Sequence, residues 1–287
     1  MLTSTFQHIH GIGEKTEKKI WAAGLTSWQT FLDAPRRAPL RQEQRDAVCR
    51  QLEQSLHHLR RRDAQYFSQR LAPALHWRLY PEFCGRVAYL DIETTGTSPH
   101  ECAITVIGVY DGHQPRAYVQ GHNLACFGAD IEEFSLLVTY NGQAFDLPFI
   151  RRELGLPLRQ AHIDLRHPLA ALGYTGGLKK IEQRLGLERE GPLALLDGWC
   201  AVLLWQYHVQ GQAGALETLL RYNLEDVIHL PALLAEVYNT RIKRLPFWLP
   251  GLAFPQPPAI PFDYDPAVVR RVLRATGKDF GDQSEIS

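Results

Sequence analysis

Two acidic residues at the end of an apolar run are the first residues that could do chemistry. Asp91 and Glu93 close the segment 87–93 and stand two positions apart. On a strand this spacing points both side chains to one face, while Leu90 and Ile92 point to the other. Two carboxylates held that close repel each other strongly unless a cation lies between them or one is protonated. The pair predicts a cation site, although the solvated end of a strand often carries two acids as well.

Two more acidic residues occur in segments that could bring them to the same place. Asp146 follows the segment 140–142 and opens a predicted helix, which it could also simply cap. Asp226 lies four residues after Tyr222 in another predicted helix, so the two side chains share a helix face. Apolar neighbours place that face beside the core, where an aspartate needs a partner or a metal.

The three acidic segments resemble the three exonuclease motifs of the DEDD superfamily in their order and approximate spacing. The motifs correspond to residues 91–96, 140–146 and 222–226. The segments 176–182 and 197–205 also resemble the small bacterial ribonuclease-H-like family typified by YprB. The resemblance covers roughly residues 85 to 240. It implies a ribonuclease H-like fold and a 3′→5′ exonuclease.

The third motif of that superfamily carries either a histidine five residues, or a tyrosine four residues, before its aspartate. These two positions hold Arg221 and Tyr222 here. The resemblance therefore implies the tyrosine (DEDDy) subclass and no catalytic histidine. His162 and His229 are left outside the predicted site, because a lone histidine is more often structural.

Two divalent metal ions are the cofactors that the resemblance implies. It assigns Asp91 as the bridging ligand, Glu93 and Asp226 as ligands of one ion each, and Asp146 as a direct or water-mediated ligand. Hard carboxylate oxygens suit Mg²⁺ or Mn²⁺, and the absence of Cys/His clusters from the sequence argues against zinc. Tyr222, with an ordinary pKa of about 10, is expected to be neutral and to position the attacking water.

Candidate substrate contacts lie in two predicted turns. Thr94, Thr95 and Gly96 follow the first predicted strand. They could let the backbone approach the terminal nucleotide, or they could only form the turn. Asn141, which precedes Asp146 in the second segment, is a similar candidate.

The amino-terminal segment 8–20 resembles the hairpin of a helix-hairpin-helix motif. Gly11 and Gly13 permit a tight turn whose amides, at a helix amino terminus, could bind a backbone phosphate. Lys15, Lys18 and Lys19 would add attraction that does not depend on base sequence. A plain glycine turn before a surface helix is the alternative.

The elements that must position these residues follow from hydrophobic periodicity. Residues 86–93, 102–110 and 116–120 are predicted strands, and Asp111-Gly112 joins the last two as a hairpin. A short strand is expected at 136–140, and helices at 145–154, 178–185, 193–209 and 216–238. Strands followed by alternating elements indicate an α/β fold with a mixed sheet and flanking helices, here of the ribonuclease H-like type.

Composition divides the chain into three expected parts. Residues 1–80 are a helical, helix-hairpin-helix-like segment for nucleic-acid binding, with 13 Lys/Arg against 7 Asp/Glu. Residues 85–244 form the exonuclease domain, and residues 81–287 hold 18 Lys/Arg against 24 Asp/Glu. Residues 245–287 are expected to form a Pro- and aromatic-rich strap and tail. A basic segment beside an acidic domain suits a nuclease, because phosphates need cations and divalent metals need carboxylates.

Other features limit the class of protein. The five cysteines are scattered without a CxxC pair, which argues against a disulfide framework and a structural zinc site. No run of 18 apolar residues occurs, so we expect a cytoplasmic protein without a membrane partner. The expected partner is nucleic acid, DNA in preference to RNA and single strands in preference to duplex. An exoribonuclease that trims RNA ends and a catalytically idle nucleic-acid-binding module remain the alternatives.

Overall fold

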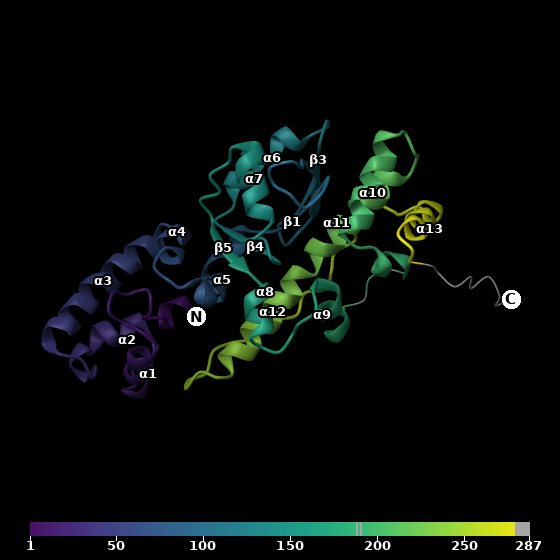
Figure 1. Cartoon of the computed structure of the whole chain (residues 1–287). Coiled ribbons are helices and arrows are strands. Elements are labelled where there is room, and N and C mark those ends of the chain that lie inside the picture. The colour runs from purple at the N-terminus through teal and green to yellow at the C-terminus, as the bar shows by residue number, and fades with distance from the viewer. Residues whose placement is uncertain (188, 190, 279–287) are drawn as a thin grey trace.

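The computed structural model describes residues 1–187, 189 and 191–278 of the chain. Its centre is a mixed five-stranded sheet of order β3-β2-β1-β4-β5 (Figure 1). β1 pairs antiparallel with β2, and β2 pairs antiparallel with β3; β1 pairs parallel with β4, and β4 parallel with β5. The strands are β1 (Val87–Thr94), β2 (Ile104–Tyr110), β3 (Pro115–Val119), β4 (Leu136–Thr139) and β5 (Ala161–Asp164). The predicted α/β class with a mixed sheet is confirmed.

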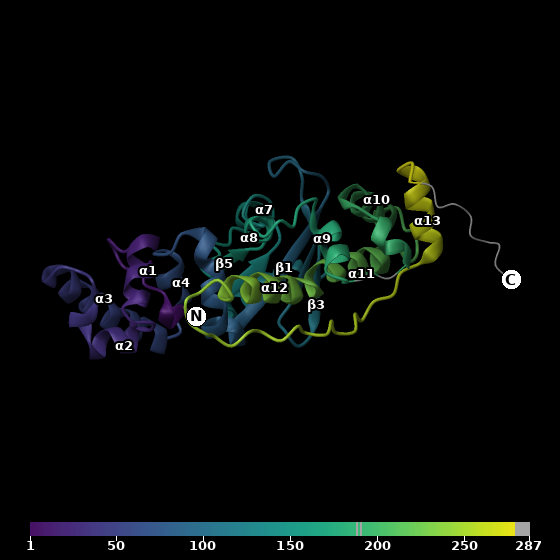
Figure 2. The ribbon, with the colours of Figure 1, turned by 90° about the horizontal axis from the view of Figure 1, so that it is seen from below.

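The two faces of the sheet follow the period of two in β1. Ala88, Leu90 and Ile92 pack in one apolar cluster with residues of α6 (Phe127–Asp130) and α7 (Asp146–Leu154). Val87 and Tyr89 belong to the opposite cluster, with residues of α11 (Ala215–Ile228) and α12 (Leu230–Ile242). Helices therefore cover both faces, and α11 and α12 lie across one of them (Figure 2). This alternation leaves Asp91 and Glu93 on the α11 side.

Two predicted helices are each interrupted. The expected helix 216–238 is α11 followed by α12, because Pro231 in the first turn of α12 has no N–H to continue the ladder. The expected helix 193–209 is a 3₁₀ turn (Gly191–Leu195) followed by α10 (Gly198–Val209). Asp197 separates them by capping α10, where its carboxylate accepts from the N–H groups of Trp199 and Cys200.

Some elements were not predicted from the sequence. β5 has four residues, one of them a histidine, and so carries too short a pattern to be recognised. α13 (Pro266–Ala275) lies in the segment expected to be a strap and tail. It buries Val268, Val269 and Val272 in a cluster with residues of α10 and α11. Between α12 and α13, residues 245–264 run over the surface as an irregular strap (Figure 2).

The first 86 residues form helices and 3₁₀ turns joined by loops, and they share a core with the sheet. Glu17 of α1 is buried, accepts from the N–H of Phe6 at 2.7 Å and pairs with Arg78 at 3.0 Å. This ion pair ties the amino-terminal turn to the segment that leads into β1. The helices are α1 (Glu14–Ala22), α2 (Trp28–Asp33), α3 (Gln42–Arg60), α4 (Ala64–Ser68) and α5 (Tyr80–Phe83), with 3₁₀ turns at Leu2–Ser4, Pro35–Arg37, Pro73–Leu79 and Cys84–Arg86.

The remaining helices connect the sheet to α10. They are α8 (Arg166–Ala170) and α9 (Leu178–Arg184). Two 3₁₀ turns, Leu124–Cys126 and Ile131–Glu133, lie between β3 and β4. Within the described part of the chain, no helix is both long and apolar enough to cross a membrane.

Candidate metal centre

Three carboxylates from β1 and α11 meet at one point. One oxygen each from Asp91, Glu93 and Asp226 all lie within 4.8 Å of one another. The strand spacing of two points Asp91 and Glu93 toward α11, and the last turn of that helix brings Asp226 against them. The structure therefore brings together three of the four acidic residues that the sequence selected.

Asp146 lies beside this group, and its carboxylate contacts the backbone of β1. It is the first residue of α7, and its Oδ1 accepts from the N–H of Ile92 at 3.1 Å. Ile92 stands between the two acidic residues of β1, so the fourth carboxylate is fixed next to them. The side chain is buried and makes no cap of its own helix.

Burial and mutual repulsion make this cluster hard to ionise without a cation. Burial, followed by the charges of neighbouring carboxylates, raises the pKa of Asp91 and of Glu93 well above the usual range. Burial also raises the pKa of Asp146 to about 7. A divalent cation would remove that penalty, and the clustered ligands are carboxylate oxygens, as Mg²⁺ and Mn²⁺ prefer. The residues present fit such an ion.

Asn223 and Gly108 complete the support of the cluster. Asn223 of α11 donates from Nδ2 to Asp91 at 3.0 Å and more weakly to Glu93 at 3.4 Å. Gly108 of β2 pairs with Asp91 in the sheet, and a Cβ there would overlap with the Oδ1 of Asn223. The missing side chain lets the helix approach the strand. Neither residue was predicted from the sequence.

Tyr222 lies one helical turn before Asp226 and is buried. Burial, followed by the neighbouring carboxylates, raises its pKa well above the ordinary value, so the hydroxyl stays protonated near neutral pH. Lys179 of α9 places its Nζ 4.5 Å from the centre of the tyrosine ring, in a cation–π contact.

Two cations stand beside the acidic cluster. Arg189 pairs with Asp226 and with Glu182 of α9. The ammonium of Lys179 is buried and has no hydrogen-bond partner among the described residues, and burial lowers its pKa. From the sequence, residues 176–182 were used only for a family resemblance, and no role was assigned to Lys179 or Arg189.

Comparisons with known proteins bear on this arrangement. A family model described as the RNase_H superfamily matches residues 88–238, more than half of the chain. The chain belongs to the RNase_H superfamily. Among solved structures, it is similar to the family B DNA polymerase from the hyperthermophilic archaeon Pyrobaculum calidifontis, with 18% identity and a TM-score of 0.43. That match covers 56% of this chain and 26% of the polymerase chain. A comparison with curated protein sequences finds no match.

In this RNase_H superfamily domain, the side-chain hydroxyls of the turn after β1 form hydrogen bonds to nearby backbone groups. Thr94 donates from its hydroxyl to the carbonyl of Gly96 at 2.5 Å, and the hydroxyl of Thr95 accepts from the N–H of Ala103 at 3.0 Å. A Cβ on Gly96 would approach the Sγ of Cys102 to 2.7 Å. The turn thus accounts for all three residue types, and their predicted contact with substrate stays a prediction.

The turn after β4 likewise engages Asn141. Its φ is +69°, its N–H donates to Asp164 at 2.8 Å, and its side-chain oxygen accepts from Arg166 at 2.5 Å. Of the two histidines left outside the predicted site, His162 contacts Thr139 at 2.9 Å and His229 contacts Glu182 at 3.1 Å. Each histidine has a structural contact.

The predicted phosphate-binding turn lies before α1, and the amino-terminal helices α1 to α3 stand apart from β1 and α11 (Figure 1). Gly11 has a φ of +82°, and Gly13 precedes the first residue of α1. Both border a hollow of about 610 Å³ that Gln51 and Arg70 also line. Lys15 is exposed on α1. The hollow offers space for a ligand, while the predicted role of these residues stays a prediction.

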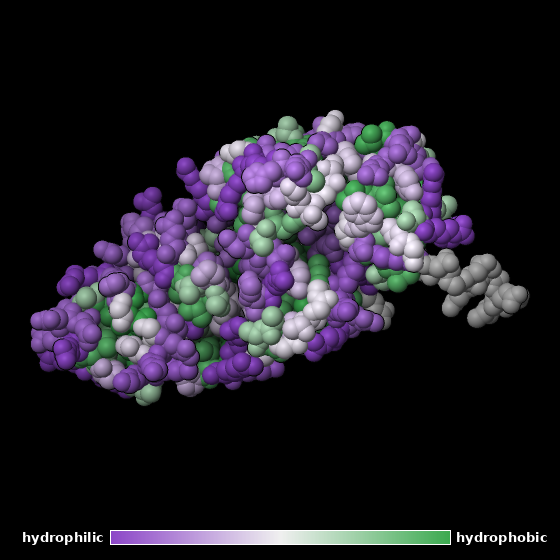
Figure 3. Space-filling model, viewed as in Figure 1, coloured by the Kyte–Doolittle hydropathy of each residue, from purple (hydrophilic) through white to green (hydrophobic). Residues whose placement is uncertain are grey.

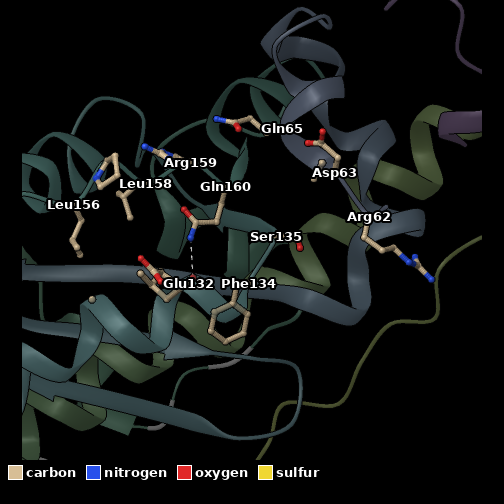
Figure 4. A pocket seen from close by; sticks show the side chains of 14 residues that line it. Arg62, Asp63, Gln65, Glu132, Phe134, Ser135, Leu156, Leu158, Arg159 and Gln160 are labelled. Atoms are coloured by element: carbon tan, nitrogen blue, oxygen red, sulfur yellow. Dashed lines mark hydrogen bonds between the residues drawn. The ribbon is translucent and has the colours of Figure 1, made fainter. Parts of the chain in front are cut away.

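Another hollow, of about 560 Å³, lies between α4 and the sheet domain (Figure 4). Arg62 and Gln65 line one side of it, and Ser135 and Gln160 line the other. Ser135 and Gln160 precede β4 and β5, whereas the carboxylates of β1 stand at the opposite ends of the parallel strands. This hollow is therefore separate from the metal centre.

Proposed function

We propose that this protein is a metal-dependent 3′→5′ exonuclease of the DEDDy type that hydrolyses single-stranded DNA. The observation that carries the proposal is the meeting of Asp91, Glu93 and Asp226, with Tyr222 one turn before Asp226. The RNase_H superfamily membership supports a nuclease, and the resemblance of the three motifs supports the 3′→5′ direction.

Asp91, Glu93 and Asp226, with Asp146 directly or through water, would hold two divalent cations. Such ions, when bound, acidify a water and stabilise charge on the attacking and leaving oxygens of a phosphodiester. The protein supplies the geometry: Asn223 fixes two of the carboxylates, and β1 gives them a rigid base.

Tyr222 would orient the attacking water and would not deprotonate it. Its pKa is raised well above the ordinary value, so it keeps its proton at neutral pH. A neutral hydroxyl can donate one hydrogen bond and accept another, which is enough to aim a water at the phosphorus.

An apolar face of α10 favours an unpaired strand as the substrate. Trp199 and Val209 are 61% and 69% exposed on this helix. Between them, Val202 and Gln206 line a hollow of about 290 Å³ together with Thr95, two residues after Glu93. Figure 3 shows mixed polar and apolar surface over α10 and its neighbours. Stacking of a base on an aromatic side chain contributes about 1–3 kcal/mol, and a duplex would keep the faces of its bases covered.

End-labelled single strands of DNA and RNA, incubated with Mg²⁺ or Mn²⁺, test the proposal. We expect stepwise release of mononucleotides from a free 3′ hydroxyl, faster from DNA than from RNA. Faster digestion of RNA would favour the exoribonuclease alternative. Equal cutting of a 3′-blocked strand or a closed circle would replace the exonuclease proposal with an endonuclease. Binding without any hydrolysis would leave an idle nucleic-acid-binding module.

A further inference from the structure

A chain of buried charged and polar groups leads away from Asp226. The side chain of Arg189 is 3% exposed and that of Glu182 is 1% exposed. Arg189 donates from Nε to Glu182 Oε2 at 2.6 Å and from Nη2 to Asp226 Oδ1. On the far side, Glu182 Oε1 contacts His229 Nδ1 at 3.1 Å. The proposed hydrolysis uses none of Arg189, Glu182 and His229.

The burial of these charged side chains costs free energy, which points to a role for them at the site. Removing an arginine and a glutamate from water carries a desolvation penalty that only good geometry offsets. Glu182 remains ionised here: burial raises its pKa, but the hydrogen bond from His229 and the charge of Arg189 bring it below the ordinary value. Glu182 is thus a fixed anion that holds the guanidinium against Asp226.

The contact takes up one of the two oxygens of Asp226. Arg189 occupies Oδ1, and the planar guanidinium fixes the orientation of the carboxylate. Oδ2 remains for a cation shared with Asp91 and Glu93, whose oxygens stand within 4.8 Å of an oxygen of Asp226. A ligand held in this way loses little conformational freedom when the ion binds.

We propose that Arg189 is a positioning residue for the metal ligand Asp226, and that Glu182 and His229 anchor it. This inference rests on the proposed function only in taking Asp226 as a metal ligand. The opposite possibility is that Arg189 stands in for the metal and is displaced by it. That arrangement would leave Glu182 buried without its arginine, so the geometry favours an arginine that stays in place.

The two possibilities predict opposite changes in metal affinity, which makes Mn²⁺ binding to the full-length protein the test. Titration calorimetry would give the Kd for Mn²⁺ without nucleic acid. For Arg189→Gln we expect a Kd about 10- to 100-fold weaker, as for other residues that orient metal ligands. Arg189→Lys should fall between this variant and the wild type, because it keeps the charge but loses the planar fork.

Two further variants test whether the effect runs through this chain of contacts. Glu182→Gln should weaken Mn²⁺ binding as well, and combining it with Arg189→Gln should add little, because both act through one chain of contacts. Arg184→Gln is the matched control, since Arg184 is exposed on α9 and donates only to the carbonyl of Gly173 among the described residues. Its Kd should equal that of the wild type. Thermal melting would show which variants keep the native fold, and Arg189→Lys supplies the test if Arg189→Gln does not.

Unchanged or tighter Mn²⁺ binding in a folded Arg189 variant would overturn the inference. The inference and the proposed function can fail separately. If the wild type degrades DNA while folded Arg189 variants bind Mn²⁺ normally, only the inference fails. If the wild type binds Mn²⁺ in an Arg189-dependent way but degrades no nucleic acid, only the proposed function fails.

Discussion

Asn223 reaches the carboxylates of β1 because residue 108 on the next strand is a glycine. The Oδ1 of Asn223 occupies the space where a Cβ of residue 108 would lie, and its Nδ2 donates to Asp91 at 3.0 Å. We predict that Gly108→Ala turns Asn223 away, lowers metal-dependent activity and destabilises the fold by roughly 1–3 kcal/mol through overpacking. Urea unfolding and hydrolysis of a labelled strand would measure both effects. Gly85→Ala is the matched control, because its Cβ would meet nothing within 4 Å.

Asp91→Asn should abolish hydrolysis while making the metal-free protein more stable at pH 8. The substitution removes one charge from a cluster in which burial and like charges raise the pKa of the carboxyl groups. Each pKa unit relieved corresponds to about 1.4 kcal/mol, so a gain on the order of 1 kcal/mol or more is expected in EDTA. Asp46→Asn, on the exposed face of α3, should change neither quantity. Wild-type activity in Asp91→Asn would eliminate Asp91 as a metal ligand.

Tyr222→Phe should lower kcat by at least about tenfold and leave the Kd for Mn²⁺ unchanged, because it removes an orienting hydroxyl and no metal ligand. Tyr238→Phe removes the hydroxyl of another buried tyrosine, on α12, and should keep full activity. Single-turnover kinetics at saturating DNA and metal would separate the two. Equal rates for the wild type and Tyr222→Phe would show that Tyr222 only packs.

Asp146 should make the metal-free protein less stable as the pH rises. Burial raises its pKa to about 7 in the folded state, against an ordinary value of about 3.9 in the unfolded state. Between these values the folded state binds more protons, so stability falls with rising pH across the window from about 4 to 7. Asp146→Asn cannot ionise and should lack this component.

The measurement is the difference in unfolding free energy between wild type and Asp146→Asn, followed from pH 4 to pH 8 in EDTA. Taking the difference cancels other groups, such as His162, whose pKa burial lowers to about 4. The wild type should lose stability relative to the variant by a few kcal/mol, at about 1.4 kcal/mol per pKa unit. A constant difference across this range would contradict the assignment.

Lys15→Gln and Gly13→Val should weaken DNA binding without slowing the chemical step. A side chain at position 13 would project into open space beside the hollow, so it would block approach to the turn without disturbing the fold. KM should rise, and each phosphate that the protein no longer neutralises should flatten the logarithmic salt dependence by about 0.7–0.9. Lys18→Gln should have a smaller effect than Lys15→Gln, because Lys18 already pairs with Glu14 at 2.6 Å. An unchanged KM and salt slope would refute the helix-hairpin-helix-like role.

Point variants are preferable to removing residues 1–80. The amino-terminal helices share one apolar cluster with the sheet and α12, so their deletion would expose the core of the remaining protein. The sequence suggested a division at about residue 80 from charge and composition. Whether these parts fold independently stays a prediction that expression of residues 85–244 alone would test.

Local periodicity determined which side chains of each element could act together. A strand turns successive residues to opposite faces, so the spacing of Asp91 and Glu93 was enough to put them on one face. The helical period likewise placed Tyr222 beside Asp226. The class of the fold and four of its five strands followed from the same kind of pattern.

Only the tertiary structure decided which other residues contact and support those side chains. Arg189, Glu182 and Asn223 belong to segments far from β1 in sequence, and no periodicity relates them to Asp91. β5 and α13 were not predicted because their formation depends on long-range interactions. β5 pairs in parallel with β4, and α13 packs against α10 and α11. A period of two or 3.6 residues fixes the face of one element, whereas the approach of two elements depends on the shapes of both, as Gly108 and Asn223 demonstrate.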